Sequence, residues 1–67
     1  MGDAHYIVRT IWDGELLDSC EFDSEILAEA YYCSTIDRWN RSDDSEGVSV
    51  QMIASDRGDV IYERYWG

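Results

Sequence analysis

The fold is decided by residues 48–54, which read Val-Ser-Val-Gln-Met-Ile-Ala and are followed by Ser55. Apolar and polar side chains largely alternate here, which is the period of a β-strand with one buried face. That buried face is predicted to consist of Val48, Val50, Met52 and Ala54. This strand is therefore the reference for assigning the rest of the chain.

A partner strand is predicted from about Asp59 to Trp66, after the turn residues Asp56-Arg57-Gly58. Glycine accepts the left-handed conformation that a three-residue hairpin loop requires, so Gly58 is expected to adopt it. The predicted cross-strand pairs are Ala54 with Val60, Met52 with Tyr62, Val50 with Arg64, and Val48 with Trp66. These pairs give the hairpin one apolar face.

A second hairpin is predicted nearer the N-terminus, because residues 5–12 and 15–22 are rich in β-branched and aromatic types and flank Asp13-Gly14. Two registers remain open. A two-residue loop pairs Arg9 with Asp18 and groups Ile7, Ile11, Leu16, Cys20 and Phe22 on one face. A three-residue loop groups Tyr6, Val8, Leu16, Cys20 and Phe22 instead. Leu16, Cys20 and Phe22 are expected in the core in either case.

A helix is predicted from about Ser24 to Asn40, with Asp23 as its N-cap and Phe22 packed on Leu27. At about 100° per residue, the expected core face gathers Ile26, Leu27, Ala30, Tyr31, Cys33 and Ser34. A second stripe is expected to face away from the sheet and consists of Ala28, Tyr32, Ile36 and Trp39. The alternative is that this second stripe is the one packed on the sheet. The segment 41–46 has no apolar residue and is predicted to be an exposed loop.

The order strand-strand-helix-strand-strand predicts an α+β fold. Its sheet has four antiparallel strands in two hairpins, and the helix packs on one face. No linker composition divides the chain, so residues 1–67 are interpreted as a single domain. The order of the strands within the sheet is not specified by these patterns.

The charge of the chain restricts its partners. Fifteen Asp and Glu residues outnumber five Arg residues, and the formal net charge is -10. Such a field repels nucleic acid and anionic membranes and attracts basic surfaces, so we expect direct binding to neither of the first two. No apolar stretch reaches the roughly 18 residues of a membrane span, and no signal-peptide pattern is found, which favours a cytoplasmic location.

Patterns typical of catalysis and metal binding are not found in the sequence. The single histidine is His5, the two cysteines Cys20 and Cys33 form no C-x-x-C motif, and no Walker A or G-x-S-x-G element occurs. We therefore expect no enzymatic activity, no cofactor and no metal site. Both cysteines are expected to be reduced and buried.

The spacing of the carboxylates suggests a role for them. Residues two apart on a strand stand about 7 Å apart, and residues four apart on a helix about 6 Å, close to the separation of successive phosphates. An ordered acidic surface is predicted to occupy the nucleic-acid groove of a basic protein. The predicted contact carboxylates are Glu21, Asp23, Glu25, Glu29, Asp37, Asp43, Asp44 and Glu46, and the exposed stripe adds Tyr32, Ile36 and Trp39.

In size, charge, lack of catalytic residues and α+β plan, the chain resembles phage-encoded inhibitors such as anti-CRISPR proteins and other DNA mimics. The resemblance is one of kind, spans the whole chain and is carried by no sequence motif. It implies a protein that blocks the DNA-binding or assembly surface of a bacterial defence complex, for example a CRISPR–Cas subunit, in the host cytoplasm.

Two alternatives belong to other functional classes. One is a structural or regulatory module that dimerises through Tyr32, Ile36 and Trp39. The other is a salt-adapted domain whose charge serves solvation alone, and which unfolds in low salt because unscreened carboxylates repel one another.

Overall fold

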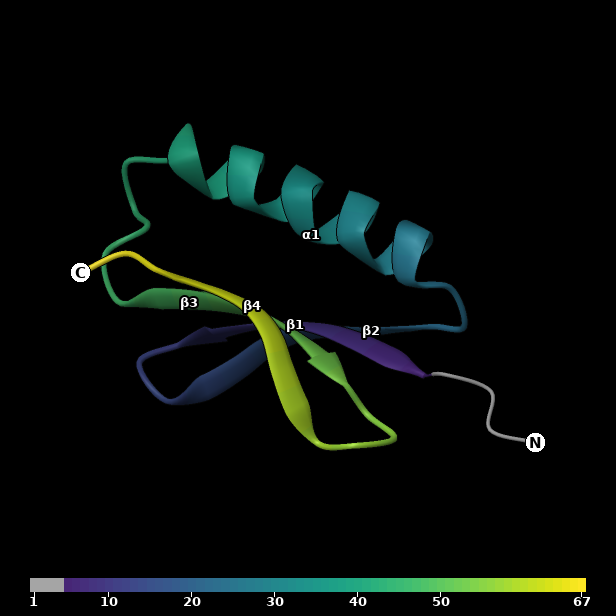
Figure 1. Cartoon of the computed structure of the whole chain (residues 1–67). Coiled ribbons are helices and arrows are strands. Elements are labelled where there is room, and N and C mark those ends of the chain that lie inside the picture. The colour runs from purple at the N-terminus through teal and green to yellow at the C-terminus, as the bar shows by residue number, and fades with distance from the viewer. Residues whose placement is uncertain (1–4) are drawn as a thin grey trace.

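The computed structural model describes residues 5–67, so residues 1–4 of the predicted single domain lie outside the described part. The elements, in chain order, are β1 (Tyr6–Trp12), β2 (Glu15–Phe22), α1 (Glu25–Asn40), β3 (Val48–Ala54) and β4 (Asp59–Tyr65). The strands form one antiparallel sheet in the order β2-β1-β3-β4, and α1 lies over one of its faces (Figure 1). The predicted α+β fold and its element order are confirmed.

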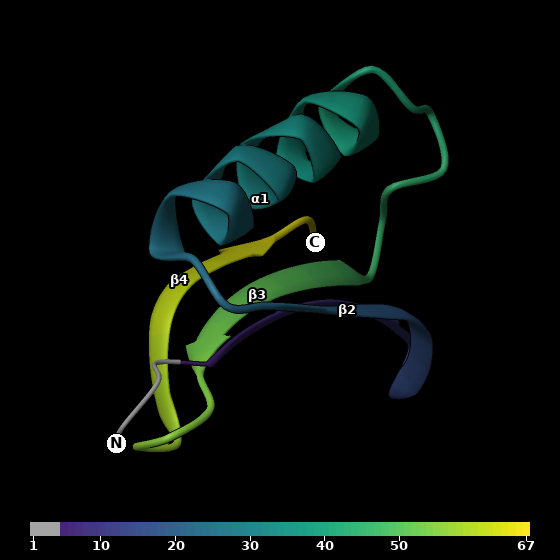
Figure 2. The same ribbon diagram turned by 90° about the vertical axis from the view of Figure 1, so that its right-hand side faces the viewer.

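The helix α1 and the sheet form two layers, which Figure 2 shows from the side, and the core lies between them. The alternation in β3 is confirmed, because its side chains Val48, Val50, Met52 and Ala54 are at most 1% exposed. Val8 of β1 and Ala28 of α1 are buried with them. The central strands β1 and β3 pair along their whole lengths, so they supply most of the buried side chains.

The predicted rotation of the helix about its axis is wrong except for Tyr31, which packs against the core, and the alternative rotation is confirmed. The stripe that packs on the sheet is the second one, made of Ala28, Tyr32, Ile36 and Trp39, and Tyr31 and Thr35 lie beside it. Ile26 and Leu27 are 79% and 60% exposed. Ala30, Cys33 and Ser34 are exposed as well. The packed stripe extends over about three turns of α1, whereas Ile26 and Leu27 both lie within its first turn.

The helix begins one residue later than predicted. Ser24 is the N-cap, with extended backbone angles of φ -125° and ψ 130°, and its Oγ accepts a hydrogen bond from the Leu27 N–H at 3.4 Å. Asp23 therefore precedes the cap. Phe22 packs on Tyr31, with ring centroids 5.4 Å apart, and Leu27 is largely exposed.

The first hairpin combines a two-residue turn with a register shift. Asp13 and Gly14 have φ of 51° and 82°, and Trp12 pairs with Glu15. A bulge then leaves Leu17 without a counterpart in the pairing. The bulge reverses the alternation, so Leu16 lies opposite Ile11 and is 61% exposed, not buried as predicted. The side chains that face α1 are Tyr6, Val8, Cys20 and Phe22, as in the second open register.

The second hairpin keeps most of its predicted register. Met52 pairs with Tyr62, Val50 pairs with Arg64, and the Trp66 N–H donates to the Val48 carbonyl at 2.9 Å. Gly58 has a φ of 74°, as expected. A shift next to Ile53 places Val60 opposite Ile53, so the predicted Ala54–Val60 pair is wrong. Both edge strands thus carry an irregularity, which disfavours pairing with another chain's strand.

Two further expectations concern the cysteines and the membrane. Cys20 and Cys33 are free, Cys20 is half-buried, and Cys33 is exposed because of the different helix rotation. The expectation that both are buried is therefore wrong. Within residues 5–67, no helix has the length and apolar character needed to cross a membrane.

Candidate protein-binding surface

Carboxylates gather where the turn between β1 and β2 meets the loop that follows α1. We call this region the acidic end, and it consists of Trp12, Asp13, Glu15, Asp43, Asp44 and Glu46. The antiparallel pairing of β1 with β3 creates it, because Trp12 lies opposite Val48, the first residue after the loop. Two segments about 30 residues apart in the chain are thereby joined.

The loop of the acidic end is tied to the sheet. The Trp12 Nε1–H donates to the Glu46 carbonyl at 3.3 Å, and the Asp13 N–H donates to the Gly47 carbonyl at 3.5 Å. Gly47 has a φ of 86°, and a Cβ on it would lie 3.7 Å from the Trp12 ring. The loop backbone therefore packs closely on the indole, which anchors the segment that carries the neighbouring carboxylates.

Trp12 is 46% exposed and lines a shallow hollow of about 400 Å³ with Asp43, Asp44 and Glu46. Within residues 5–67, no carboxylate of the acidic end lies at ion-pair distance from an Arg or His side chain. An aromatic face beside carboxylates attracts cations by both charge and cation–π interaction. The hollow is therefore suited to receive a Lys or Arg side chain from a partner.

At the opposite end of β1, two predicted contact residues converge on His5. Its Nε2 lies 3.1 Å from Glu21 Oε1, and its Nδ1 lies 3.6 Å from Asp23 Oδ1. Because β2 ends at Phe22, Asp23 does not continue the strand spacing on which the phosphate comparison was based. His5 thus lies between both carboxylates of this pair, which leaves them less open to a partner's cations than those of the acidic end.

The helix carboxylates are mostly engaged with their own chain. Glu29 accepts a hydrogen bond from the Tyr62 hydroxyl at 3.0 Å, and this bond raises the pKa of Tyr62. Asp37 pairs with Arg41 at 3.0 Å, one helical turn away. Glu25 lies in the first helical turn, where a negative charge is favourable to the helix dipole. These residues do not join the acidic end.

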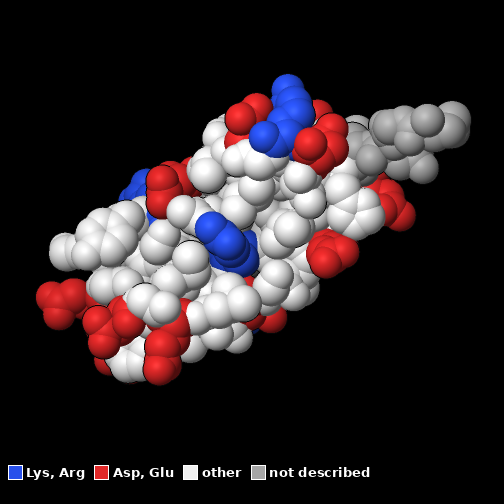
Figure 3. Space-filling model, turned by 90° about the horizontal axis from the view of Figure 1, so that it is seen from below, with Lys and Arg blue, Asp and Glu red and all other residues white. Residues whose placement is uncertain are grey.

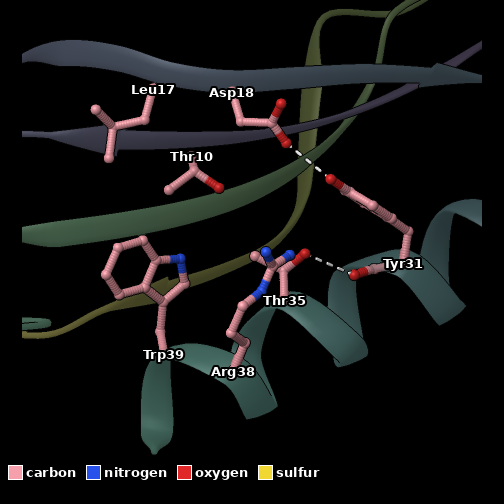
Figure 4. Close-up of a pocket in the computed structure, with 7 residues that line it drawn as sticks. All are labelled: Thr10, Leu17, Asp18, Tyr31, Thr35, Arg38 and Trp39. Carbon is pink, nitrogen blue, oxygen red and sulfur yellow. Dashed lines mark hydrogen bonds between the residues drawn. The ribbon is translucent and has the colours of Figure 1, made fainter. Parts of the chain in front are cut away.

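A smaller hollow of about 260 Å³ lies between β2 and α1 (Figure 4). There the Tyr31 hydroxyl donates to Asp18 Oδ2 at 2.7 Å. Its contact with the Cys20 thiol, the hydrogen bond to Asp18 and burial together raise the pKa of Tyr31 to about 12. Arg38 and Trp39 also line this hollow. At neutral pH Tyr31 is therefore a fixed hydrogen-bond donor and no base.

The predicted contact residues thus divide into separate groups. Asp43, Asp44 and Glu46 come together at the acidic end. Tyr32, Ile36 and Trp39 pack between helix and sheet, so the prediction that they form an exposed stripe is wrong.

The sequence-based prediction of contact residues did not include Trp12, Asp13 and Glu15 of the acidic end. The Asp13-Gly14 turn placed them at a hairpin tip, but only the pairing of β1 with β3 brings that tip to the loop. In the described part of the chain, no group of three or more His, Cys, Asp or Glu side chains is arranged to hold a metal ion.

We compared the chain with known proteins. No protein-family model, curated protein or solved structure matches it.

Proposed function

We propose that this chain is a non-catalytic binding protein that places its carboxylates on the basic nucleic-acid-binding surface of another protein. It acts there as an inhibitor that mimics DNA or RNA. The acidic end carries the proposal: Asp43, Asp44 and Glu46 share a hollow with the exposed Trp12 indole, and two hydrogen bonds tie their loop to Trp12 and Asp13.

The physical basis is the one by which phosphate backbones bind basic proteins. Arg and Lys side chains gain charge-charge attraction, and the counterions around the carboxylates are released. Fixed carboxylates are favoured over mobile ones, because less conformational entropy is lost when a partner docks. The anchoring of the loop backbone to Trp12 and to Asp13 supports this proposal.

The two alternative functions, a dimerising module and a salt-adapted domain, require different structural features. A dimer through Tyr32, Ile36 and Trp39 requires an exposed stripe, whereas these side chains pack against the core. A salt-adapted domain requires only solvated charge, and it unfolds when salt is withdrawn. Thermal unfolding at low and high salt separates this last reading from the proposal.

The proposal is tested by affinity capture from a bacterial lysate at about 50 mM and about 500 mM salt, which differ severalfold in screening length. Captured proteins are expected to bind nucleic acid, to elute at the higher salt and to be displaced by duplex DNA. The triple variant Asp43→Asn, Asp44→Asn, Glu46→Gln removes charge with little change in shape and is expected to abolish capture.

The matched control is the double variant Glu21→Gln, Asp23→Asn at the opposite end, which is expected to retain most of the capture. The proposal is wrong if the same proteins are held equally by the triple variant, or if neither salt nor DNA releases them.

A further inference from the structure

The face of the sheet opposite α1, which we call the open face, is ordered in three rows that cross the strands. The register gives a row Glu21–Ile7–Ile53–Val60, a middle row Ser19–Arg9–Gln51–Glu63, and a row Leu16–Ile11–Ser49–Tyr65. No helix or strand of residues 5–67 covers this face (Figure 1). Two patches containing apolar side chains therefore flank one polar row.

The polar row is held together by hydrogen bonds. Arg9 Nε donates to Gln51 Oε1 at 2.7 Å, and Gln51 Nε2 donates to Glu63 Oε2 at 2.8 Å. The polar groups of this row are thus largely paired within the sheet. The apolar patches beside it remain accessible: Leu16 is 61%, Val60 49% and Tyr65 65% exposed.

Carboxylates border this face. Both hairpin turns bend to the side away from α1 and carry Asp13 and Asp56, and the register places Glu21 and Glu63 on the two edge strands of this face (Figures 1 and 2). In the space-filling view from this side, uncharged side chains fill most of the surface, acidic side chains lie mainly along its borders, and basic ones are few (Figure 3). Of the basic residues, Arg9 lies in the polar row and Arg57 pairs with Asp59 at 3.6 Å.

We infer that the open face is a docking surface for a basic partner protein, one that presents apolar side chains bordered by Lys and Arg. The inference rests on the proposed function and adds to it an apolar contact that salt does not screen. Charge decides the occupant: a second copy of the chain would bring two acidic borders together, whereas a basic border neutralises them. The apolar patches supply desolvated contacts inside that border.

The variant that tests this is Ile53→Thr. Ile53 lies between Ile7 and Val60 in its row, and threonine keeps the β-branching that suits a central strand. The matched control is Ile26→Thr on the first turn of α1, where the isoleucine is 79% exposed and remote from the open face. The two variants remove the same atoms from different surfaces.

The probe is a synthetic amphipathic helical peptide with a leucine face bordered by lysines, titrated into the intact protein and followed by Trp fluorescence and by amide chemical shifts. We expect shifts along β1 and β3, and a dissociation constant raised about fivefold by Ile53→Thr, as fits the loss of apolar contact area. Ile26→Thr is expected to leave it unchanged. At about 0.5 M salt, where charges are screened, the Ile53→Thr difference is expected to persist.

Equal affinities for the two threonine variants, or shifts confined to the acidic end, overturn the inference. If the triple variant of the acidic end still loses its captured protein in that case, the proposed function stands. If sedimentation shows a dimer that Ile53→Thr dissociates, the open face belongs to a second copy, which also overturns the inference.

Discussion

The two faces of the sheet are built from alternate residues of the same strands, yet they differ in kind. On the face under α1, the β3 side chains are at most 1% exposed, and all are apolar. On the open face, the same strand presents Ser49, Gln51 and Ile53, and two of these are polar. The single helix in residues 5–67 covers one face. A chain this short buries one core, and its second face is left for solvent or a partner.

The largest expected effect comes from truncating the covered face. Met52→Ala removes a fully buried side chain between α1 and the sheet, so it is expected to lower the free energy of unfolding by about 3 kcal/mol. The open-face change Ser49→Ala on the same strand is expected to cost about 0.5 kcal/mol. Urea denaturation of both variants measures the contrast. Similar losses from the two would mean that the faces are not energetically distinct.

A second test compares two faces of the helix. Ala28 is fully buried against the sheet, so Ala28→Leu is expected to overpack the core and destabilise the protein by about 2 kcal/mol. Ala30 is exposed, so Ala30→Leu is expected to change stability by no more than about 0.5 kcal/mol. Thermal unfolding distinguishes them. The reverse order would restore the helix rotation predicted from the sequence.

The acidic end offers a smaller effect. Gly47 has a φ of 86°, which an L side chain adopts with strain, so Gly47→Ala is expected to cost about 1 kcal/mol. The added methyl group would touch the Trp12 indole, so Trp12 fluorescence is expected to change as well. Gly14→Ala, at a φ of 82° but with open space around it, serves as the control for strain alone. An unchanged indole signal in Gly47→Ala would contradict the packing of the loop on Trp12.

The smallest expected effect on stability comes from Tyr31, at the edge of the face covered by α1. The pKa of Tyr31 is raised from its ordinary value of 10.0 to about 12, so the folded state favours the neutral phenol. The resulting stability is fully present below about pH 10 and is lost as the pH rises toward 12. Asp18→Asn removes the carboxylate acceptor and is expected to lower the pKa of Tyr31, which an absorbance titration of tyrosinate measures. A titration curve unchanged by this substitution would rule out Asp18 as a cause.

Much of the fold could be predicted because it depends on interactions between residues close together in the sequence. The alternation at 48–54, the Asp13-Gly14 turn and the left-handed Gly58 each depend on a few neighbouring residues, and all three are confirmed. The strand pairs Met52–Tyr62 and Val50–Arg64 follow from the same hairpin. Of the candidate site, the loop carboxylates Asp43, Asp44 and Glu46 could be placed on an exposed loop, because no apolar residue accompanies them.

The sequence by itself therefore determined the order of the strands and the helix along the chain, the buried face of β3 and the acidic charge. Only the tertiary structure decided which helix stripe packs, where the two bulges reverse the alternation, and that Trp12 meets the loop after α1. The reason is physical. Turn and strand preferences act between neighbours in the chain, whereas helix rotation and the meeting of distant loops depend on how whole surfaces fit together.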